Sequence, residues 1–131
     1  MDTLANMLIT IKNGGNAHKV SVETPFSVMK SEIARVLLEL GYIQGYEKKN
    51  RKTKGDILSI TLKYDTANGS PRVHEVVRIS KPSRRLYGNT KNIYQVKHGR
   101  GHLVLSTPKG ILEGGQAIRE HVGGELLFEI W

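Results

Sequence analysis

The sequence has no cysteine among its 131 residues, which excludes disulfide bonds, thiolate metal sites and a cysteine nucleophile. It also lacks long apolar runs, because the longest uninterrupted ones are a few residues and far too short to span a membrane. The opening residues, Met1-Asp2-Thr3, carry no charged leader before an apolar segment, so no secretory signal is predicted. We therefore expect a soluble, intracellular protein.

The motifs of familiar enzyme classes are missing as well. The sequence contains no Walker phosphate loop, no dinucleotide fingerprint, no nucleophile elbow and no helical His-Glu-x-x-His. Its histidines are scattered without a carboxylate or second ligand at useful spacing, which argues against a metal site: they are His18, His74, His98, His102 and His121. We expect no enzyme, no cofactor and no small-molecule substrate. One alternative stays open, an RNA-cleaving enzyme in which His98 and His102 act as acid and base beside Lys109.

Acidic residues are scarce in the middle of the chain, and this imbalance says more than the net charge of +8. Residues 48–109 hold 15 Lys/Arg against 3 Asp/Glu, whereas the remainder holds 5 Lys/Arg against 9 Asp/Glu. A positive field concentrated in half the chain suits a polyanion, either nucleic acid or an anionic membrane surface. The membrane alternative is weaker because the basic segments lack a broad apolar helical face. A solvated basic surface with no partner is the remaining interpretation.

Two stretches of the first half have the apolar spacing of amphipathic helices. The first helix is predicted to be capped by Asp2 and ended by Gly14-Gly15, with apolar positions at Leu4, Met7, Leu8 and Ile11. The second follows Pro25 and ends just before Gly41, with a predicted apolar stripe of Met29, Ile33, Val36, Leu37 and Leu40. Lys30 is expected off that stripe.

Alternating and β-rich segments predict the remaining elements. Strands are expected at residues 20–22, 42–47, 57–64, 73–80, 102–107 and 125–131, and a short, poorly capped helix at 113–122. Asn68-Gly69-Ser70-Pro71 is the best boundary between lobes. The sequence thus predicts an α+β fold of two small lobes: a helix-strand-helix-hairpin lobe at 1–66 and a mostly β lobe with a short helix at 67–131.

Two polar segments are candidates for contact with RNA. Residues 48–56 form a predicted hairpin loop with five basic residues, which suits phosphate and equally suits an ordinary solvated turn. Further along, Ser106-Thr107-Pro108-Lys109-Gly110 brings together two hydroxyls, an ammonium group and a glycine turn at the end of a strand. Hydroxyls donate to phosphate, sugar 2′-OH groups or base edges, and the lysine neutralises charge. A plain Ser/Thr turn is the competing interpretation.

The segment Ser106-Thr107-x-Lys109-Gly110-Ile111-Leu112 resembles the signature of the small ribosomal subunit protein eight family, bacterial type. Other blocks that resemble this family follow in the same order: Asp2 to Leu8 with Ile11-Lys12-Asn13, Leu62-Lys63-Tyr64, Arg78 to Pro82 with Arg84 to Tyr87, and Gly123 to Trp131. The resemblance covers essentially the whole chain.

The resemblance implies a structural protein whose C-terminal lobe grips a distorted stem in the central domain of 16S ribosomal RNA and helps to assemble the platform and body of the small subunit. It implies a cytoplasmic, ribosome-bound location, in a bacterium or an organelle of bacterial descent, with other small-subunit proteins as neighbours. The implied RNA-binding residues are Ser106, Thr107, Lys109, Gly110, Tyr87, Gly124, Glu125 and Lys30, with Arg84 and Arg85 from a matching block. Tyr87 would stack on a base or sugar. Glu125 would accept from a base amino group or a 2′-OH, or orient the neighbouring hydroxyls.

The chain departs from the family pattern at three places. Pro108 stands where a serine is usual, which removes a hydroxyl and a backbone donor. Glu113 replaces a small hydroxyl residue, and residues 97–102 are more basic than the family pattern. A regulatory role is a further hypothesis, since the same surface would bind a mimic of the stem in the protein's own messenger RNA and repress translation.

Overall fold

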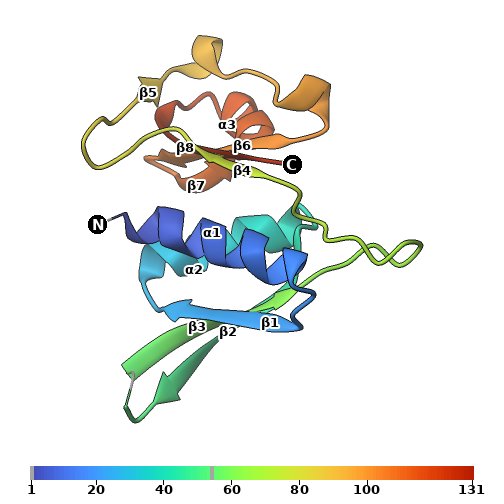
Figure 1. Ribbon diagram of the computed structural model, residues 1–131. Helices are drawn as coiled ribbons and strands as arrows, with labels where there is room; N and C mark the ends of the chain where they lie inside the picture. The colour runs from blue at the N-terminus through green and yellow to red at the C-terminus, as the bar shows by residue number, and fades with distance from the viewer. Residues whose placement is uncertain (1, 54) are drawn as a thin grey trace. The chain divides into compact units, whose positions relative to one another are not determined.

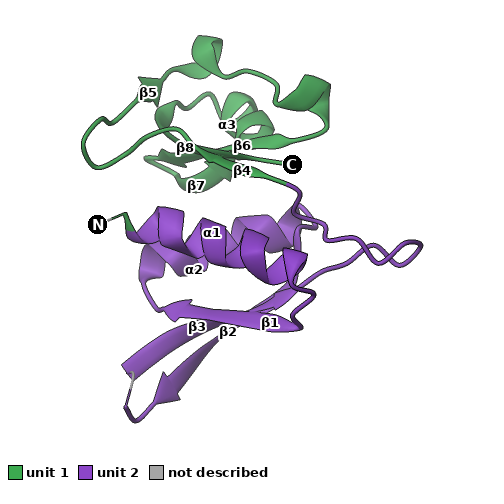
Figure 2. Cartoon of the chain, viewed as in Figure 1, with its two compact units in different colours: residues 1–2, 75–131 green, residues 3–74 purple. Residues whose placement is uncertain are grey.

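A computed structural model of the chain describes residues 2–53 and 55–131. The chain divides into two compact units, an N-terminal unit of residues 3–74 and a C-terminal unit of residues 75–131 together with Asp2 (Figure 2). The predicted α+β class is confirmed, with a helix-strand-helix-hairpin arrangement first and a mostly β arrangement after it. A functional division at residues 66/67 stays a prediction. Within the described ranges, every helix is too short or too polar to cross a membrane.

In the N-terminal unit, two helices lie on one face of a three-stranded antiparallel sheet (Figure 1). The elements in chain order are α1 (Thr3–Asn16), β1 (Ser21–Pro25), α2 (Val28–Glu39), β2 (Ile43–Arg51) and β3 (Gly55–Leu62). The strand order β1-β3-β2 makes β3 the central strand. The core between helices and sheet is apolar, and its fully buried members include Met7, Leu8, Ile11, Ile33, Leu37, Leu58 and Ile60. Each such side chain contributes roughly 1.5–3 kcal/mol through its removal from water.

The prediction that the first helix stops at Gly14-Gly15 is wrong, because α1 continues to Asn16. His18 adopts the left-handed conformation (φ 55°) that glycine usually takes after a helix, and the Lys19 amide donates to the Gly14 carbonyl at 3.0 Å. Gly14 is a packing residue instead. A Cβ atom there would lie 2.5 Å from Cγ1 of Val22, so the missing side chain lets α1 approach β1.

The buried face of α2 is rotated from the predicted stripe. Met29 is 41% exposed, whereas Lys30 is only 5% exposed, so the expectation that Lys30 lies off the buried face is wrong. The Lys30 ammonium donates to Thr24 Oγ1 at 3.3 Å and to the Pro25 carbonyl at 3.2 Å. These hydrogen bonds explain how a cation is tolerated there. Burial nevertheless lowers the pKa of Lys30.

Most of the predicted basic loop is strand, since β2 continues to Arg51 and β3 begins at Gly55. Two of its cations are paired with carboxylates of the same sheet: Lys48 Nζ lies 3.6 Å from Asp56 Oδ2, and Arg51 Nη2 lies 2.8 Å from Glu23 Oε2. Lys54 lies outside the described residues. The positive charge of this hairpin is therefore partly neutralised.

The C-terminal unit is a five-stranded antiparallel sheet with the order β4-β8-β6-β7, and β5 also pairs with β8 (Figure 1). Its elements are β4 (Val76–Arg78), β5 (Tyr87–Gly88), the 3₁₀ turns η1 (Thr90–Asn92) and η2 (Lys97–Gly99), β6 (His102–Thr107), β7 (Gly110–Glu113), α3 (Gly114–Arg119) and β8 (Gly124–Ile130). One core cluster joins the sheet to α3 and to the connector before β6, through Val96, Leu103, Leu105 and Ala117.

The segment after the Ser/Thr turn differs from the prediction in two ways. Residues 110–113 form strand β7, which pairs with β6 and completes a hairpin. The following helix, α3, is shorter than the predicted helix at 113–122. The expectation that it is poorly capped is wrong. The Glu113 carboxylate accepts a hydrogen bond from the Gln116 amide at 3.0 Å, which is the role of a helix N-cap.

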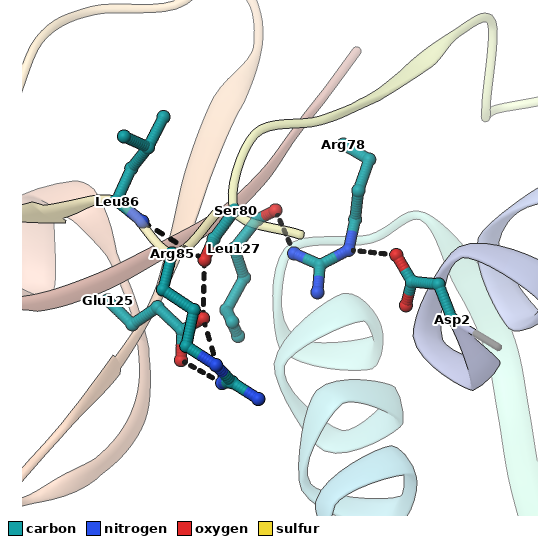
Figure 3. Close-up of polar contacts among 7 residues, drawn as sticks. All are labelled: Asp2, Arg78, Ser80, Arg85, Leu86, Glu125 and Leu127. Carbon is teal, nitrogen blue, oxygen red and sulfur yellow. Dashed lines mark hydrogen bonds and ion pairs between the residues drawn. The ribbon is translucent and has the colours of Figure 1, made fainter. Parts of the chain in front are cut away.

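A bulge in β8 explains why two neighbouring residues of that strand are both buried. Val104 pairs with Phe128 and Leu105 pairs with Leu126, so Leu127 is an extra residue in β8. Its carbonyl accepts from Arg78 Nη1 at 2.6 Å, and Arg78 Nε donates to Asp2 Oδ2 at 3.0 Å (Figure 3). The bulge thus interrupts the alternation of side chains between the two faces of β8.

Candidate nucleic-acid interface

Three of the predicted site residues form a row across three adjacent strands. In the register of the sheet, Tyr87 of β5 lies opposite Glu125 of β8, and Glu125 lies opposite Ser106 of β6. A second row follows at the strand ends, where Gly88 is opposite Gly124 and the β6–β7 turn begins. The three residues come from distant parts of the chain. They lie in one row because β5 and β6 pair with opposite edges of β8. We call this end of the sheet the Tyr87–Glu125–Ser106 row.

Glycine at position 124 is required by the close approach of β6. A Cβ atom on Gly124 would lie 2.0 Å from the carbonyl oxygen of Ser106 and 3.0 Å from Cα of Thr107. Gly123 is restricted in the same way by the β5 side, since its Cβ atom would lie 2.3 Å from the carbonyl oxygen of Gly88. The two glycines thus let three backbones lie close together beneath the row.

The two hydroxyls of the turn have different situations. Thr107 Oγ1 donates to the Gly110 carbonyl at 2.8 Å and accepts from the Lys109 amide at 3.1 Å, so its proton is already used. Among residues 2–53 and 55–131, no side-chain hydrogen bond is seen for Ser106, which is half-buried. Ser106 therefore keeps a donor for an incoming group, whereas Thr107 shapes the turn and offers only lone pairs.

The cations around the row differ in how far they are engaged. Lys109 Nζ lies 3.8 Å from Glu120 Oε1, a loose and exposed ion pair. Arg84 is exposed on a tight turn that its own backbone closes, through hydrogen bonds in both directions with Lys81 at 2.9 and 3.0 Å. Arg85 is engaged, since its Nη1 lies 3.3 Å from each carboxylate oxygen of Glu125.

The Glu125 carboxylate is held by a second group that the sequence did not suggest. The buried hydroxyl of Ser80 donates to Glu125 Oε2 and accepts from the Leu86 amide at 3.2 Å (Figure 3). The predicted alternation places Ser80 on one face of its strand. That alternation does not indicate that the Ser80 hydroxyl contacts the carboxylate of Glu125, 45 residues further along the chain. The possibility that Glu125 orients Ser106 or Thr107 finds no support in these contacts.

The remaining candidates are not members of the row. Lys30 belongs to the N-terminal unit, and its ammonium is satisfied by Thr24 and Pro25. His98 sits in a left-handed conformation (φ 54°) in the connector before β6, and His102 begins β6, at the opposite end of that strand from Thr107. The residues that the structure describes contain no group of three or more His, Asp or Glu able to hold a metal ion.

Comparisons with known proteins identify the family. The model of the family "Ribosomal protein S8" matches residues 2–131. The chain is 42% identical to small ribosomal subunit protein uS8 of Rhizobium rhizogenes strain K84, over 130 residues that cover 99% of this chain and 97% of that protein. It is 38% identical, with the same coverage, to small ribosomal subunit protein uS8 of Sphingopyxis alaskensis, and 40% identical to that of Nitrobacter hamburgensis. With a match of this extent, the chain belongs to the ribosomal protein S8 family, a family of structural ribosomal proteins and not of enzymes.

Proposed function

We propose that this member of the ribosomal protein S8 family, a structural constituent of the small ribosomal subunit, binds an irregular stem in the central domain of 16S ribosomal RNA through the Tyr87–Glu125–Ser106 row and the β6–β7 turn. It binds early and helps to assemble the platform and body of the subunit. The protein is ribosome-bound and touches neighbouring small-subunit proteins. Residues 67–131 form the RNA-binding lobe.

The observation that carries this proposal is the composition of the row. It combines an exposed aromatic ring, a hydroxyl with a free donor and a fixed acceptor on three adjacent strands. Tyr87 is 67% exposed, and an exposed ring on a rigid strand is a stacking platform for a base or sugar. A protein that reads an irregular RNA needs such directional groups in addition to charge.

Charge supplies the general affinity. Between Glu75 and Glu113 the chain has eight Lys/Arg and no Asp/Glu, and this segment contains β5, β6 and the β6–β7 turn. Lys109 and Arg84 are the members near the row in the sequence that are not paired with Glu125, whereas Arg85 Nη1 lies 3.3 Å from its carboxylate. Cations of this kind release counterions from RNA when they bind phosphate, which makes the affinity depend on salt. Lys30 contributes a second contact, for which its ammonium would have to exchange its present partners.

The test compares the purified protein on two RNAs, the central-domain stem and an unrelated duplex of equal length. We expect tighter binding to the stem at every salt concentration, and co-sedimentation of the native protein with small ribosomal subunits in a high-salt gradient. Equal affinity for the two RNAs would overturn the proposal, because the row would then contribute no specificity for the stem over other RNA.

The same surface would recognise a stem of like shape in the protein's own messenger RNA. No separate group on the protein is needed for this regulatory role. A reporter fused to the messenger's leader would decrease in expression when the protein is supplied in excess. An unchanged reporter would exclude the role.

A further inference from the structure

Ser80 joins three segments of the C-terminal unit through one buried hydroxyl group. The group accepts from the Leu86 amide, just before β5, and donates to the Glu125 carboxylate in β8 (Figure 3). The backbone closes the same connection, since the Leu126 amide donates to the Leu86 carbonyl at 2.9 Å. Ser80 is 0% exposed, so water does not compete for these bonds.

Arg85 holds the same carboxylate from the solvent side. Its side chain is 57% exposed and that of Glu125 is 12% exposed. Ion pairs with an exposed cation are weak and screened by salt. The orientation of the carboxylate therefore comes mainly from Ser80, while Arg85 neutralises its charge.

A carboxylate in a row that faces RNA needs both a fixed orientation and a neutralised charge. An unpaired negative charge would repel phosphate, and a freely rotating carboxylate would select no particular donor. Once neutralised and fixed, the group accepts from a 2′-OH or a base amino group in one direction only. The Leu86 amide in turn donates to the Ser80 hydroxyl, which holds that hydroxyl in position to donate to Glu125.

We propose that Ser80 is a positioning residue for RNA recognition, and that Arg85 acts through Glu125 and not on a phosphate. The proposal rests on the function proposed above. It assigns specificity to a side chain that RNA never touches, and it separates Arg85 from the generic cations of the surface.

The binding test uses a double-mutant cycle on the central-domain stem and on an unrelated duplex. Ser80→Ala should weaken binding to the stem by about tenfold, as expected for one lost charged hydrogen bond, and change binding to the duplex by less than about twofold. In a Glu125→Gln background, Ser80→Ala and Arg85→Ala should each add almost nothing. Ser83→Ala, a change at an exposed serine of the same loop, is the matched control and should leave both affinities unchanged.

Two results would overturn the proposal. Additive losses in the double variants would show that Ser80 and Glu125 act independently. A smaller salt slope in Arg85→Ala, by about one unit, would show that Arg85 contacts a phosphate directly.

A measurement on the free protein separates this proposal from the function on which it rests. Hydrogen exchange at the Leu86 amide should accelerate in Ser80→Ala and stay unchanged in Ser83→Ala, while the amides of β6 keep their protection. If Leu86 exchange were unaffected, the positioning role would fail whatever the RNA does. If the wild-type protein failed to prefer the stem, the proposed function would fail instead.

Discussion

The hydroxyl of Thr107 donates to the carbonyl of Gly110 at 2.8 Å, which ties the two ends of the β6–β7 turn together. The same oxygen accepts from the amide of Lys109 at 3.1 Å. The threonine therefore has a structural duty that its neighbour Ser106 lacks, although both belong to the same predicted binding segment.

Thr107→Ala should lower the free energy of unfolding by about 1 kcal/mol, because one hydroxyl makes two local bonds at a solvent-accessible turn. It should also weaken binding to the stem more than binding to an unrelated duplex. Ser106→Ala should weaken stem binding while leaving the unfolding midpoint almost unchanged. Chemical denaturation and RNA titration of both variants distinguish the roles. Equal destabilisation by the two changes would contradict this division.

Gly124→Ala should cost at least about 2 kcal/mol of stability, because its Cβ atom would meet the Ser106 carbonyl at 2.0 Å and force two strands apart. Gly45→Ala is the matched control, since a Cβ atom there meets nothing within 4 Å. It should change the free energy of unfolding by less than about 0.5 kcal/mol. Urea denaturation measures both, and similar values for the two variants would show that β6 can move away from β8.

Tyr87→Leu should reduce binding to the stem by about 1–3 kcal/mol, the loss expected for one stacked base. Tyr87→Phe should retain most of the affinity, because stacking needs the ring and not the hydroxyl. The side chain is exposed, so both variants should unfold at nearly the wild-type midpoint. A loss as large in Tyr87→Phe as in Tyr87→Leu would assign the contact to the hydroxyl.

Lys52→Ala should lower the slope of log affinity against log salt by about one unit if the β2–β3 hairpin reaches phosphate. Lys48→Ala should lower it less, because Lys48 already lies 3.6 Å from Asp56 and 4.5 Å from the centre of the Phe26 ring. Titrations at several salt concentrations give both slopes. An unchanged slope in Lys52→Ala would remove the hairpin from the interface.

Lys30 should make stability rise with pH in the alkaline range. Its pKa is lowered by burial, so between the folded value and the unfolded value near 10.5 the unfolded chain binds more protons. Stability then increases with pH through that window, and the penalty of burying the charge is fully present below it. Lys30→Met should remove this rise, whereas Lys19→Met, at an exposed position, should keep it. Urea denaturation at a series of pH values from neutral to about 10.5 measures the free energy of unfolding of each variant. The same pH dependence of that free energy in wild type and Lys30→Met would contradict the prediction.

Periodicity predicted the main elements because apolar spacing responds directly to burial. The buried positions of α1, from Leu4 to Ile11, follow their spacing. Glycine misleads where it serves packing: Gly14-Gly15 predicts a helix end, because the sequence cannot show that a Cβ atom on Gly14 would lie 2.5 Å from Cγ1 of Val22. The burial of Lys30 on α2 could not be predicted from spacing either, since it depends on two acceptors for its ammonium, the carbonyl of Pro25 and the hydroxyl of Thr24.

The candidate site was predictable only in part. The polar character of Ser106 to Gly110 is visible in the sequence, and the family resemblance added Tyr87 and Glu125. The position of Ser80 beneath Glu125 depends on which strands are neighbours, and strand order is not written in local patterns. The same is true of Glu113, whose role as a helix cap follows from β7, a strand with too few residues to show alternation.

The strand order of the C-terminal unit has a consequence for how the protein is made. β8 is the last strand in the chain, yet β4, β5 and β6 all pair with it. During synthesis, Tyr87 and Ser106 are therefore made before Glu125, the residue with which both of them pair in the sheet. Under the proposed function, we expect stem recognition to begin only after Gly124–Ile130 have emerged and paired with β4, β5 and β6.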